Sequence, residues 1–347
     1  MTFKAKGMRE MLKVAIIGLG DVSFIHRKAI EESTVAELVA VCDINPTKHE
    51  LYRDTPFYTQ IDDLLKKQSL DVVHICLPHD LHVPVAKQVI HHGIAVFLEK
   101  PVGLNYKEAY ELADEVTRLK AKVGVCFQNR YNKSVKVLKE KLASEDYGQL
   151  VAVKGLVAWG RPLSYYTSKP WRGMMARAGG GTIINQAIHT YDLMQYLAGD
   201  IVDVKASLSN MTGYPIEVED TAVAQINFSD GVHGFAMSTN AYAANSSVEL
   251  QVILERSKFT IKDYQLYETT DLGKVCIAED KVSTKSKSYY GPSHQEAIDA
   301  FYQALLTETT DYITVQNALP SMIMLDLMKQ SSKTGKRISK GDYLHDS

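Results

Sequence analysis

The sequence has only four cysteines among its 347 residues, and no two of them form a Cys-x-x-Cys pair. Cys42, Cys76 and Cys126 lie in apolar runs typical of strands, where a free cysteine behaves as a small buried hydrophobe. The spacing therefore predicts no metal site and no disulfide framework. It favours a reducing compartment.

Long apolar runs and an excess of one charge are also missing. No stretch is long enough to cross a bilayer, and residues 1–11 carry basic side chains without the apolar core of a signal peptide. The 39 basic and 41 acidic residues give a formal net charge of −2, and there is no basic stripe. We therefore expect neither nucleic acid nor a membrane as a partner, and we expect a cytoplasmic protein.

The length and the residue pattern of the first part indicate an α/β protein of two domains. Up to about residue 130, short apolar strands alternate with amphipathic helices, which predicts an N-terminal doubly wound parallel sheet with helices on both faces. The expected strands are residues 12–18, 37–42, 71–77, 95–98 and 123–127, and the expected helices are residues 24–32, 61–67, 82–92 and a segment from Asn105.

After residue 130 the pattern changes to strands with period-2 alternation. These predict a C-terminal α/β domain with a large, mostly antiparallel open sheet, arranged as a meander, with a hairpin at Ser229-Asp230-Gly231. Helices are expected to cover one face of this sheet and leave the other for a partner. The predicted domains are 1–130 and 131–347, joined near residues 128–132. The expected elements are strands 151–159, 221–228, 232–239 and 248–254, and helices 133–143, 293–306 and 315–332.

A dinucleotide fingerprint lies between the first strand and the first helix. Gly18 permits a tight turn, Gly20 lets the backbone approach a pyrophosphate, and Ser23 is small enough to replace the third glycine. Asp43 ends the next strand, where its carboxylate can bind the ribose hydroxyls of NAD and would repel the extra phosphate of NADP. The alternative is a glycine turn in a protein that binds no nucleotide.

Two further segments carry groups suited to acid–base chemistry. The strand 95–98 ends in Glu99-Lys100-Pro101, and ligands of parallel sheets bind at the carboxyl ends of the strands. Downstream, a triple glycine leads into an expected helix on which Asn185 and His189 share a face with Asp192. An oriented histidine is a plausible general base near neutral pH. Taken alone, the first segment is better explained as an exposed strand end and the second as a buried structural histidine, and only the combination with the dinucleotide fingerprint favours catalysis.

Together these segments resemble the Gfo/Idh/MocA oxidoreductase family, nearly from end to end. The resemblance rests most on the glycine loop, on Glu99-Lys100-Pro101 and on the triple glycine before His189. It is supported by the segments Cys76-Leu77-Pro78 with His82, His26, Phe127-Gln128-Asn129-Arg130-Tyr131, Trp171-Arg172, His294 with Phe301, and Thr334-Gly335.

The resemblance implies a Rossmann domain, a sugar-like or cyclitol substrate and a homodimer or homotetramer formed through the open sheet. The last helix, about 315–333, would pack back on the cofactor domain. It implies no metal. The implied catalytic residues are Lys100, His189 and Asn185. The implied cofactor-binding residues are Gly18, Gly20, Asp21, Val22, Asp43, Leu77, Pro78, His82, Glu99, Lys100 and Asn129, and the implied substrate-binding residues are Lys100, Arg130, Trp171, Arg172, Asn185, His189 and Asp192.

One departure from the family concerns Asn185, because many of its dehydrogenases carry aspartate there. Asparagine can orient His189 by a hydrogen bond but cannot stabilise an imidazolium by charge, so Lys100 would carry more of the proton transfer. The resulting hypothesis is an NAD(P)-dependent dehydrogenase acting on a CH–OH group, with NAD favoured over NADP. The alternatives are an NAD-dependent glycosidase that uses transient oxidation and a non-catalytic regulator that binds NAD and sugar.

Overall fold

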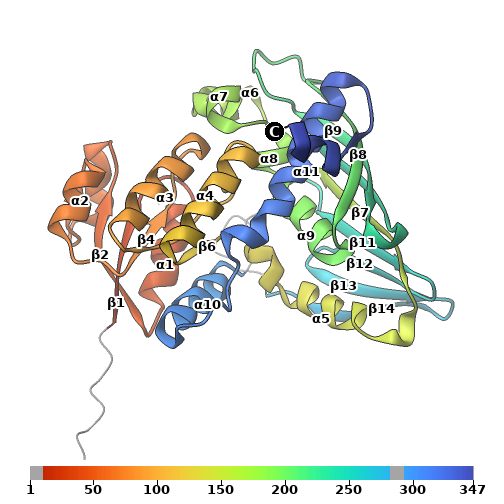
Figure 1. Cartoon of the computed structure of the whole chain (residues 1–347), viewed down its shortest axis with the longest axis horizontal. Helices are drawn as coiled ribbons and strands as arrows, with labels where there is room; N and C mark the ends of the chain where they lie inside the picture. Colours follow the sequence, from red (N-terminus) through yellow and green to blue (C-terminus); the bar gives the residue numbers. More distant parts are fainter. Residues whose placement is uncertain (1–10, 282–292, 347) are drawn as a thin grey trace, which may run out of the picture.

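The computed structural model describes residues 11–281 and 293–346, and its first layer is a six-stranded sheet. The strand order is β3-β2-β1-β4-β5-β6, and every neighbouring pair is parallel, which confirms the predicted Rossmann-like sheet (Figure 1). The strands are β1 (Leu12–Ile17), β2 (Ala36–Cys42), β3 (Phe57–Tyr58), β4 (Val72–Ile75), β5 (Ala95–Leu98) and β6 (Val123–Val125).

Helices cover both faces of this sheet because successive side chains of a strand point to opposite faces. On β1, Val14 and Ile16 pack with apolar residues of α1 and α10, whereas Ala15 and Ile17 belong to the cluster that contains α2, α3 and α4. The helices are α1 (Ser23–Glu31), α2 (Ile61–Lys67), α3 (His82–His91), α4 (Tyr106–Leu119) and α10 (His294–Thr307), with short 3-10 turns η1 (Pro46–Tyr52), η2 (His79–Leu81) and η3 (Gln128–Tyr131).

The second layer is a nine-stranded sheet in the order β14-β13-β12-β11-β7-β10-β9-β8-β15. Its pairs are antiparallel, as predicted, except that β10 runs parallel to β7, so the prediction of a simple meander is wrong at this pair. The strands are β7 (Leu150–Ala158), β8 (Ile201–Ser209), β9 (Thr221–Phe228), β10 (His233–Thr239), β11 (Glu249–Leu254), β12 (Lys258–Lys262), β13 (Gln265–Thr270), β14 (Gly273–Glu279) and β15 (Ile338–Ser339).

The parallel pair follows from the helical segment between β7 and β8. A crossover that contains helices lets β8 run in the direction of β7, and the two antiparallel pairings that follow give β10 the same direction. The remaining helices are α5 (Lys133–Leu142), α6 (Leu163–Thr167), α7 (Met175–Ala178), α8 (Thr182–Asn185), α9 (Ile188–Ala198), α11 (Val315–Thr334) and α12 (Lys340–Asp346), with 3-10 turns η4 (Glu145–Tyr147), η5 (Pro170–Gly173) and η6 (Ser229–Gly231).

Helices α5, α9 and α11 pack against one face of the nine-stranded sheet (Figure 1). The opposite face carries apolar side chains that are partly open to solvent. Phe235 on β10 is 44% exposed and Val223 on the neighbouring β9 is 39% exposed. Within the described residues, no helix combines the length and the hydropathy that crossing a membrane would require.

The C-terminal part of the chain returns to the first layer. Phe301 and Tyr302 of α10 are fully buried in the cluster formed with β1 and α1. The backbone N–H of Val125 at the end of β6 donates to the carbonyl of Ile313 at 2.8 Å. Helix α11 then contacts α4 and β8, and thus lies between the two layers (Figure 1).

Candidate active site

The turn after β1 has the geometry that a dinucleotide phosphate needs. Gly18 has φ +90°, and a Cβ there would lie 2.6 Å from the carbonyl oxygen of Cys76, so only glycine fits. A Cβ on Gly20 would meet no atom within 4 Å, which leaves this backbone open to a ligand. The hydroxyl of Ser23 donates to the carbonyl of Gly20 at 2.7 Å and fixes the turn. These residues fit a pyrophosphate at the N-terminus of α1.

Asp43 follows β2 and supports the same turn. Its Oδ2 accepts the backbone N–H of Leu19 at 2.7 Å, and its Oδ1 accepts that of Asn45 at 2.8 Å. Each carboxylate oxygen keeps a further lone pair, so Asp43 can also accept hydrogen bonds from ribose hydroxyls. The sequence analysis did not foresee that this carboxylate also holds the glycine turn.

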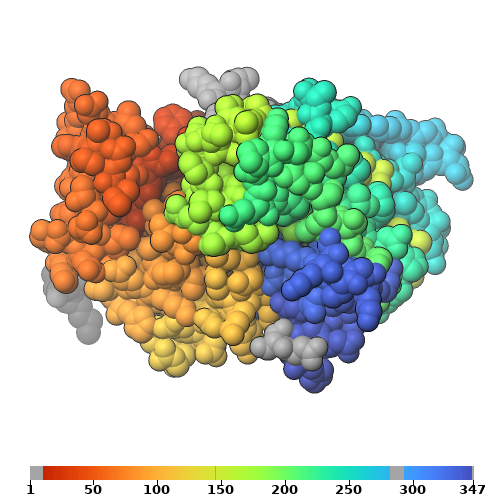
Figure 2. Space-filling model, turned by 90° about the horizontal axis from the view of Figure 1, so that it is seen from above, coloured from red at the N-terminus to blue at the C-terminus, as the bar shows by residue number. Residues whose placement is uncertain are grey.

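A cavity of about 720 Å³ opens beside the glycine turn at the carboxyl ends of the parallel strands. Its walls come from both layers of the molecule. In Figure 2 the yellow-green segment after residue 160 lies against the red and orange N-terminal residues. The predicted site residues that line the cavity are Gly18, Gly20, Asp21, Val22, Asp43, Leu77, Pro78, Glu99, Lys100, Trp171, Arg172, Asn185 and His189.

Lys100 reaches this cavity from the end of β5, and the following bond to Pro101 is cis. Its Nζ donates to the backbone carbonyl of Asn185 at 2.9 Å. Burial lowers the pKa of the lysine, and the negative charge of Glu99 partly opposes this effect. The lysine is therefore held at the wall of the cavity in a state that can exchange a proton more readily than a surface lysine can.

His189 lines the same cavity near the start of α9. Burial lowers its pKa well below the usual range, and the charge of Lys100 lowers it further, so the imidazole is neutral. Its Nδ1 is buried and has no hydrogen-bond partner among the residues that the structure describes. This ring nitrogen is therefore not held in one protonation state by a neighbouring acceptor or donor.

The expectation that Asn185 and His189 share one helix is wrong. Helix α8 ends at Asn185, and α9 begins at Ile188, so the i,i+4 spacing does not place the two side chains on one face. The Asn185 amide donates instead to the hydroxyl of Tyr165 at 3.2 Å. Asn185 therefore contributes to the site through its backbone carbonyl, which binds Lys100.

Arg130 and Asp192 do not line the cavity but form a buried ion pair with each other. Arg130 donates to Asp192 twice, at 2.8 Å from Nε and 2.6 Å from Nη2, and the side chains are 9% and 2% exposed. Ser321 of α11 donates to the same carboxylate at 2.6 Å. The pair thus joins η3, α9 and α11, and the expected contact of these two residues with substrate has no support in this geometry.

Two predicted cofactor-binding residues also lie elsewhere. His82 is fully buried, and its ring nitrogens lie 2.9 Å from the carbonyl of Leu77 and 2.6 Å from that of Pro101, so it braces the loops around the cavity. Asn129 lines a separate cavity of about 280 Å³ between α5, α9 and the nine-stranded sheet.

The cavity also contains residues that the sequence analysis missed, chiefly His79, Gln128 and Arg177. The ring of His79 packs against Trp171 with centroids 4.9 Å apart, and its Nδ1 lies 2.8 Å from the carbonyl of Ala178. His79 directly follows Pro78, just after the expected strand 71–77, so the rule that ligands bind at strand ends could have identified it.

Opposite charges connect the two layers above the glycine turn. Asp21 of the turn lies 2.8 Å from the ammonium of Lys169 and 3.5 Å from the guanidinium of Arg172. The guanidinium of Arg172 also lies over the ring of Tyr165, 4.1 Å from its centroid. These contacts hold basic side chains beside the phosphate-binding turn.

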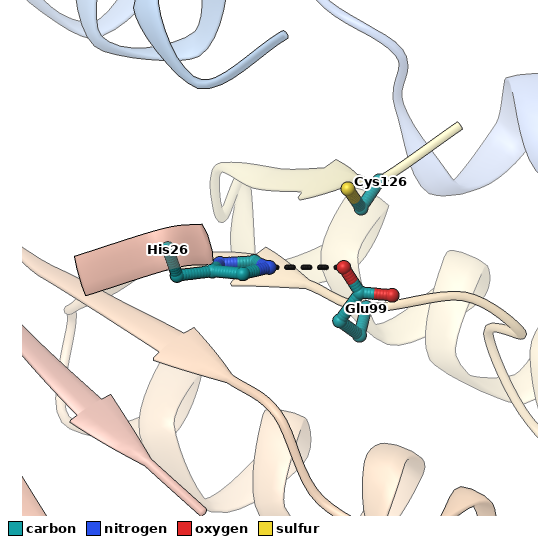
Figure 3. A group of neighbouring side chains, drawn as sticks. All are labelled: His26, Glu99 and Cys126. Atoms are coloured by element: carbon teal, nitrogen blue, oxygen red, sulfur yellow. Dashed lines mark hydrogen bonds and ion pairs between the residues drawn. The ribbon is translucent and has the colours of Figure 1, made fainter. Parts of the chain in front are cut away.

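Three potential metal ligands lie together beneath the cavity. The ligand atoms of His26, Glu99 and Cys126 are all within 4.8 Å of one another (Figure 3). Both ring nitrogens of His26 take part in hydrogen bonds, and burial raises the pKa of the Cys126 thiol well above its usual range. His26 Nε2 and Glu99 Oε1 lie 2.9 Å apart, so a metal ion would have to replace that hydrogen bond, and the geometry assigns these side chains to a hydrogen-bonded cluster.

Comparison with known proteins identifies two matching family models. The model of the oxidoreductase family with an NAD-binding Rossmann fold matches residues 12–127, and the model of the GFO/IDH/MocA C-terminal domain matches residues 135–260. Together the two models cover most of the chain, including the whole first sheet and strands β7 to β11 of the second.

The individual relatives share about a quarter of their residues with this chain. The rhizopine catabolism protein MocA of Rhizobium meliloti is 25% identical over 189 residues, which are 54% of this chain and 57% of MocA, so the match spans less than two thirds of that relative. Inositol 2-dehydrogenase of Rhizobium meliloti strain 1021 is 24% identical over 312 residues, 87% of this chain and 88% of that protein. Among solved structures, the WlbA dehydrogenase of Bordetella pertussis, in complex with NADH and UDP-GlcNAcA, shares the fold with a TM-score of 0.83 and 23% identity, over 95% of this chain and 99% of that one.

Proposed function

Because this chain belongs to the Gfo/Idh/MocA family of NAD(P)-dependent oxidoreductases, we propose that it transfers hydride between nicotinamide and a secondary alcohol of a sugar, cyclitol or sugar derivative. The observation that carries the proposal is that Lys100 and His189 line the same cavity as the glycine turn. A cofactor bound at that turn and an alcohol beside the lysine would share one enclosed space.

The bound nicotinamide would supply the hydride acceptor, and the chain's own residues would handle the proton. Burial lowers the pKa of Lys100, which makes its amine more readily available to take the proton of the hydroxyl. Burial lowers the pKa of His189 well below its usual range, so its neutral imidazole is the weaker base of the two. In the reverse direction, the lysine ammonium stabilises the oxyanion that forms as the carbonyl is reduced. Asn185 adds no charge, and its amide does not face His189, so Lys100 is the main acid–base group.

NAD is the proposed cofactor in preference to NADP. The carboxylate of Asp43 lines the cavity beside the glycine turn, where it can accept hydrogen bonds from the ribose hydroxyls. A 2′-phosphate at the same place would meet a negative charge. Lys169 and Arg172 on the opposite wall are paired with Asp21 and lie nearer the phosphate-binding turn.

Trp171 and Arg172 are the proposed substrate-binding residues of the second domain, since both line the cavity. An aromatic side chain can pack on the apolar face of a sugar ring, and a guanidinium can bind a phosphate or carboxylate substituent by two hydrogen bonds. This arrangement favours a substrate that combines a polyol ring with an anionic group.

The proposed assembly is a homodimer or homotetramer formed through the open face of the nine-stranded sheet. Phe235 and Val223 are partly exposed there, and a second copy of the same face would bury them. The Phe235→Lys variant should then form a smaller species in light scattering coupled to gel filtration. An unchanged mass would exclude this face.

The test of the proposed activity is titration with NADH and NADPH by fluorescence, followed by a screen of cyclitols, sugars and sugar phosphates at the nicotinamide absorbance. We expect tighter binding of NADH and sugar-dependent reduction of NAD. The Lys100→Met variant should keep NADH binding and lose turnover by orders of magnitude. Near-normal turnover of that variant would contradict the assigned role of the lysine. Sugar release without net NADH would contradict the dehydrogenase.

A further inference from the structure

A chain of buried hydrogen bonds ends at the carboxylate beside the catalytic lysine. Tyr302 Oη of α10 lies 2.8 Å from Nε2 of His74 on β4, and His74 Nδ1 lies 2.8 Å from Nδ1 of His26 on α1. His26 Nε2 then lies 2.9 Å from Oε1 of Glu99, directly after β5 (Figure 3). Tyr302, His74 and His26 are fully buried, and Glu99 is 6% exposed.

The chemistry of the acceptor fixes the direction of the bond between His26 and Glu99 at the end of this chain. Burial alone would raise the pKa of Glu99, but the hydrogen bond from His26 and the surrounding charges lower it overall, so Glu99 is an ionised acceptor. His26 must therefore carry a proton on Nε2, and in the arrangement in which its Nδ1 is an acceptor it accepts from His74. His74 then donates from Nδ1 and accepts at Nε2, so Tyr302 donates its hydroxyl proton.

His74 and Tyr302 both enter this arrangement as neutral groups. Burial lowers the pKa of His74 well below its usual range, so this ring is neutral, and burial raises the pKa of Tyr302, so its hydroxyl keeps its proton. An imidazolium at His26 would instead donate to His74 and reverse the bonds toward Tyr302. The two arrangements place the His74 proton on different nitrogens and can be told apart.

Within the described residues, the chain reaches the cavity at Glu99, whereas its far end at Tyr302 is buried. Tyr302 lies among buried apolar residues of the first layer, including Val72, Phe97 and Ile298. A hydrogen-bonded chain that is buried at one end can orient the group at its other end. That group is Glu99, which lines the cavity, and its charge raises the pKa of Lys100 against the larger lowering by burial.

We propose that His26, His74 and Tyr302 are positioning residues that aim the carboxylate of Glu99 and thereby set the charge of Lys100 in the cavity. The inference rests on the proposed function for its catalytic meaning, because Lys100 is the acid–base group of that reaction. The ionisation of the lysine itself can be measured without substrate or cofactor, so failure of the proposed function would not hide the result.

The test is the pH dependence of Lys100 acylation by a trace of acetic anhydride, read on the Lys100 peptide by mass spectrometry. In His74→Leu the hydrogen bond to His26 Nδ1 is lost, so the ring of His26 is held less firmly and orients Glu99 less well. The midpoint of Lys100 should therefore move to lower pH, by roughly half a unit to one unit if one hydrogen bond is lost. His74→Asn is the matched variant, because its amide N–H can replace Nδ1–H, and it should keep the original midpoint.

The far end of the chain is tested by removing a single hydroxyl. Tyr302→Phe should shift the Lys100 midpoint in the same direction as His74→Leu. Tyr191→Phe is the control, because Tyr191 is equally buried and its hydroxyl donates to Ser238 at 2.7 Å, outside the chain. If Glu99→Gln lowers the midpoint but neither His74→Leu nor Tyr302→Phe does, the positioning role is refuted.

A measurement on the unaltered protein covers the case in which the variants do not fold. Histidine labelled with ¹⁵N distinguishes the two ring nitrogens by their chemical shifts. We expect a proton on Nδ1 of His74 and on Nε2 alone of His26 at neutral pH. A proton on Nε2 of His74, or on both nitrogens of His26, would overturn the direction of the chain and with it the inference.

Discussion

The buried pair of Arg130 and Asp192 gives the sharpest test of how the two domains are joined. In Asp192→Asn the side chain keeps its shape and loses its charge, so the guanidinium of Arg130 stays buried without a counter-ion. Removing one partner of a buried ion pair costs about 3–5 kcal/mol of unfolding free energy. Because Ser321 can still donate to the amide oxygen, the lower end of this range is expected.

A second pair of the same residue types provides the control. Arg337 lies 2.6 Å from Asp203, the same separation as the closest Arg130–Asp192 contact, but the two side chains are 40% and 20% exposed. Asp203→Asn should therefore cost only about 0–1 kcal/mol. The measurement is chemical unfolding of both variants, together with NADH titration of the folded proteins.

Equal destabilisation by the two variants would refute the argument from burial. The expectation from the sequence was that Asp192 contacts the substrate, and a change in substrate affinity would support it. If Asp192→Asn kept its stability and instead raised the KM for a sugar substrate, Asp192 would have to reach the substrate. We expect the opposite, with lost stability and unchanged affinity for NADH.

Three other predictions follow from the same geometry. Gly20→Ala should keep the stability of the protein, because the new Cβ meets only open space, but it should weaken NADH binding. Gly18→Ala should instead lower the stability. Thermal unfolding measures the stability of both variants, and fluorescence titration measures their NADH binding. Asp43→Ser should lower the ratio of NADPH to NADH dissociation constants, and an unchanged ratio would exclude its role in cofactor choice. Burial lowers the pKa values of His74, His79 and His189, so below pH 6.5 the unfolded chain binds more protons than the folded one. The free energy of unfolding should therefore fall by up to about 4 kcal/mol per pH unit, which chemical unfolding at several pH values can measure.

The first layer could be predicted because its signals are local. Apolar strands, glycine turns and helix caps lie within short windows, and the end of each parallel strand is a known place for ligands. That rule placed Lys100 and Asp43 at the cavity. Applied to every strand, it would also have found His79.

The second layer depended on contacts between distant parts of the sequence. The parallel pairing of β10 with β7 depends on how a helical crossover returns, which strand periodicity does not reveal. The spacing of Asn185, His189 and Asp192 fits a single helix, but the chain breaks that helix after Asn185. The partner of Asp192 is Arg130, 62 positions away, and no local pattern pairs them.

The return of α10 to the first layer has a consequence for synthesis on the ribosome. When the ribosome has made β6, the nascent chain still lacks Phe301 and Tyr302, which fill one side of the first core. It also lacks Ile313, whose carbonyl accepts the N–H of Val125. Gly124 leaves the space for Phe301, since a Cβ there would lie 2.7 Å from that ring. The cofactor-binding half therefore completes its core only after α10 has been made, and until then an apolar surface must be shielded from other nascent chains.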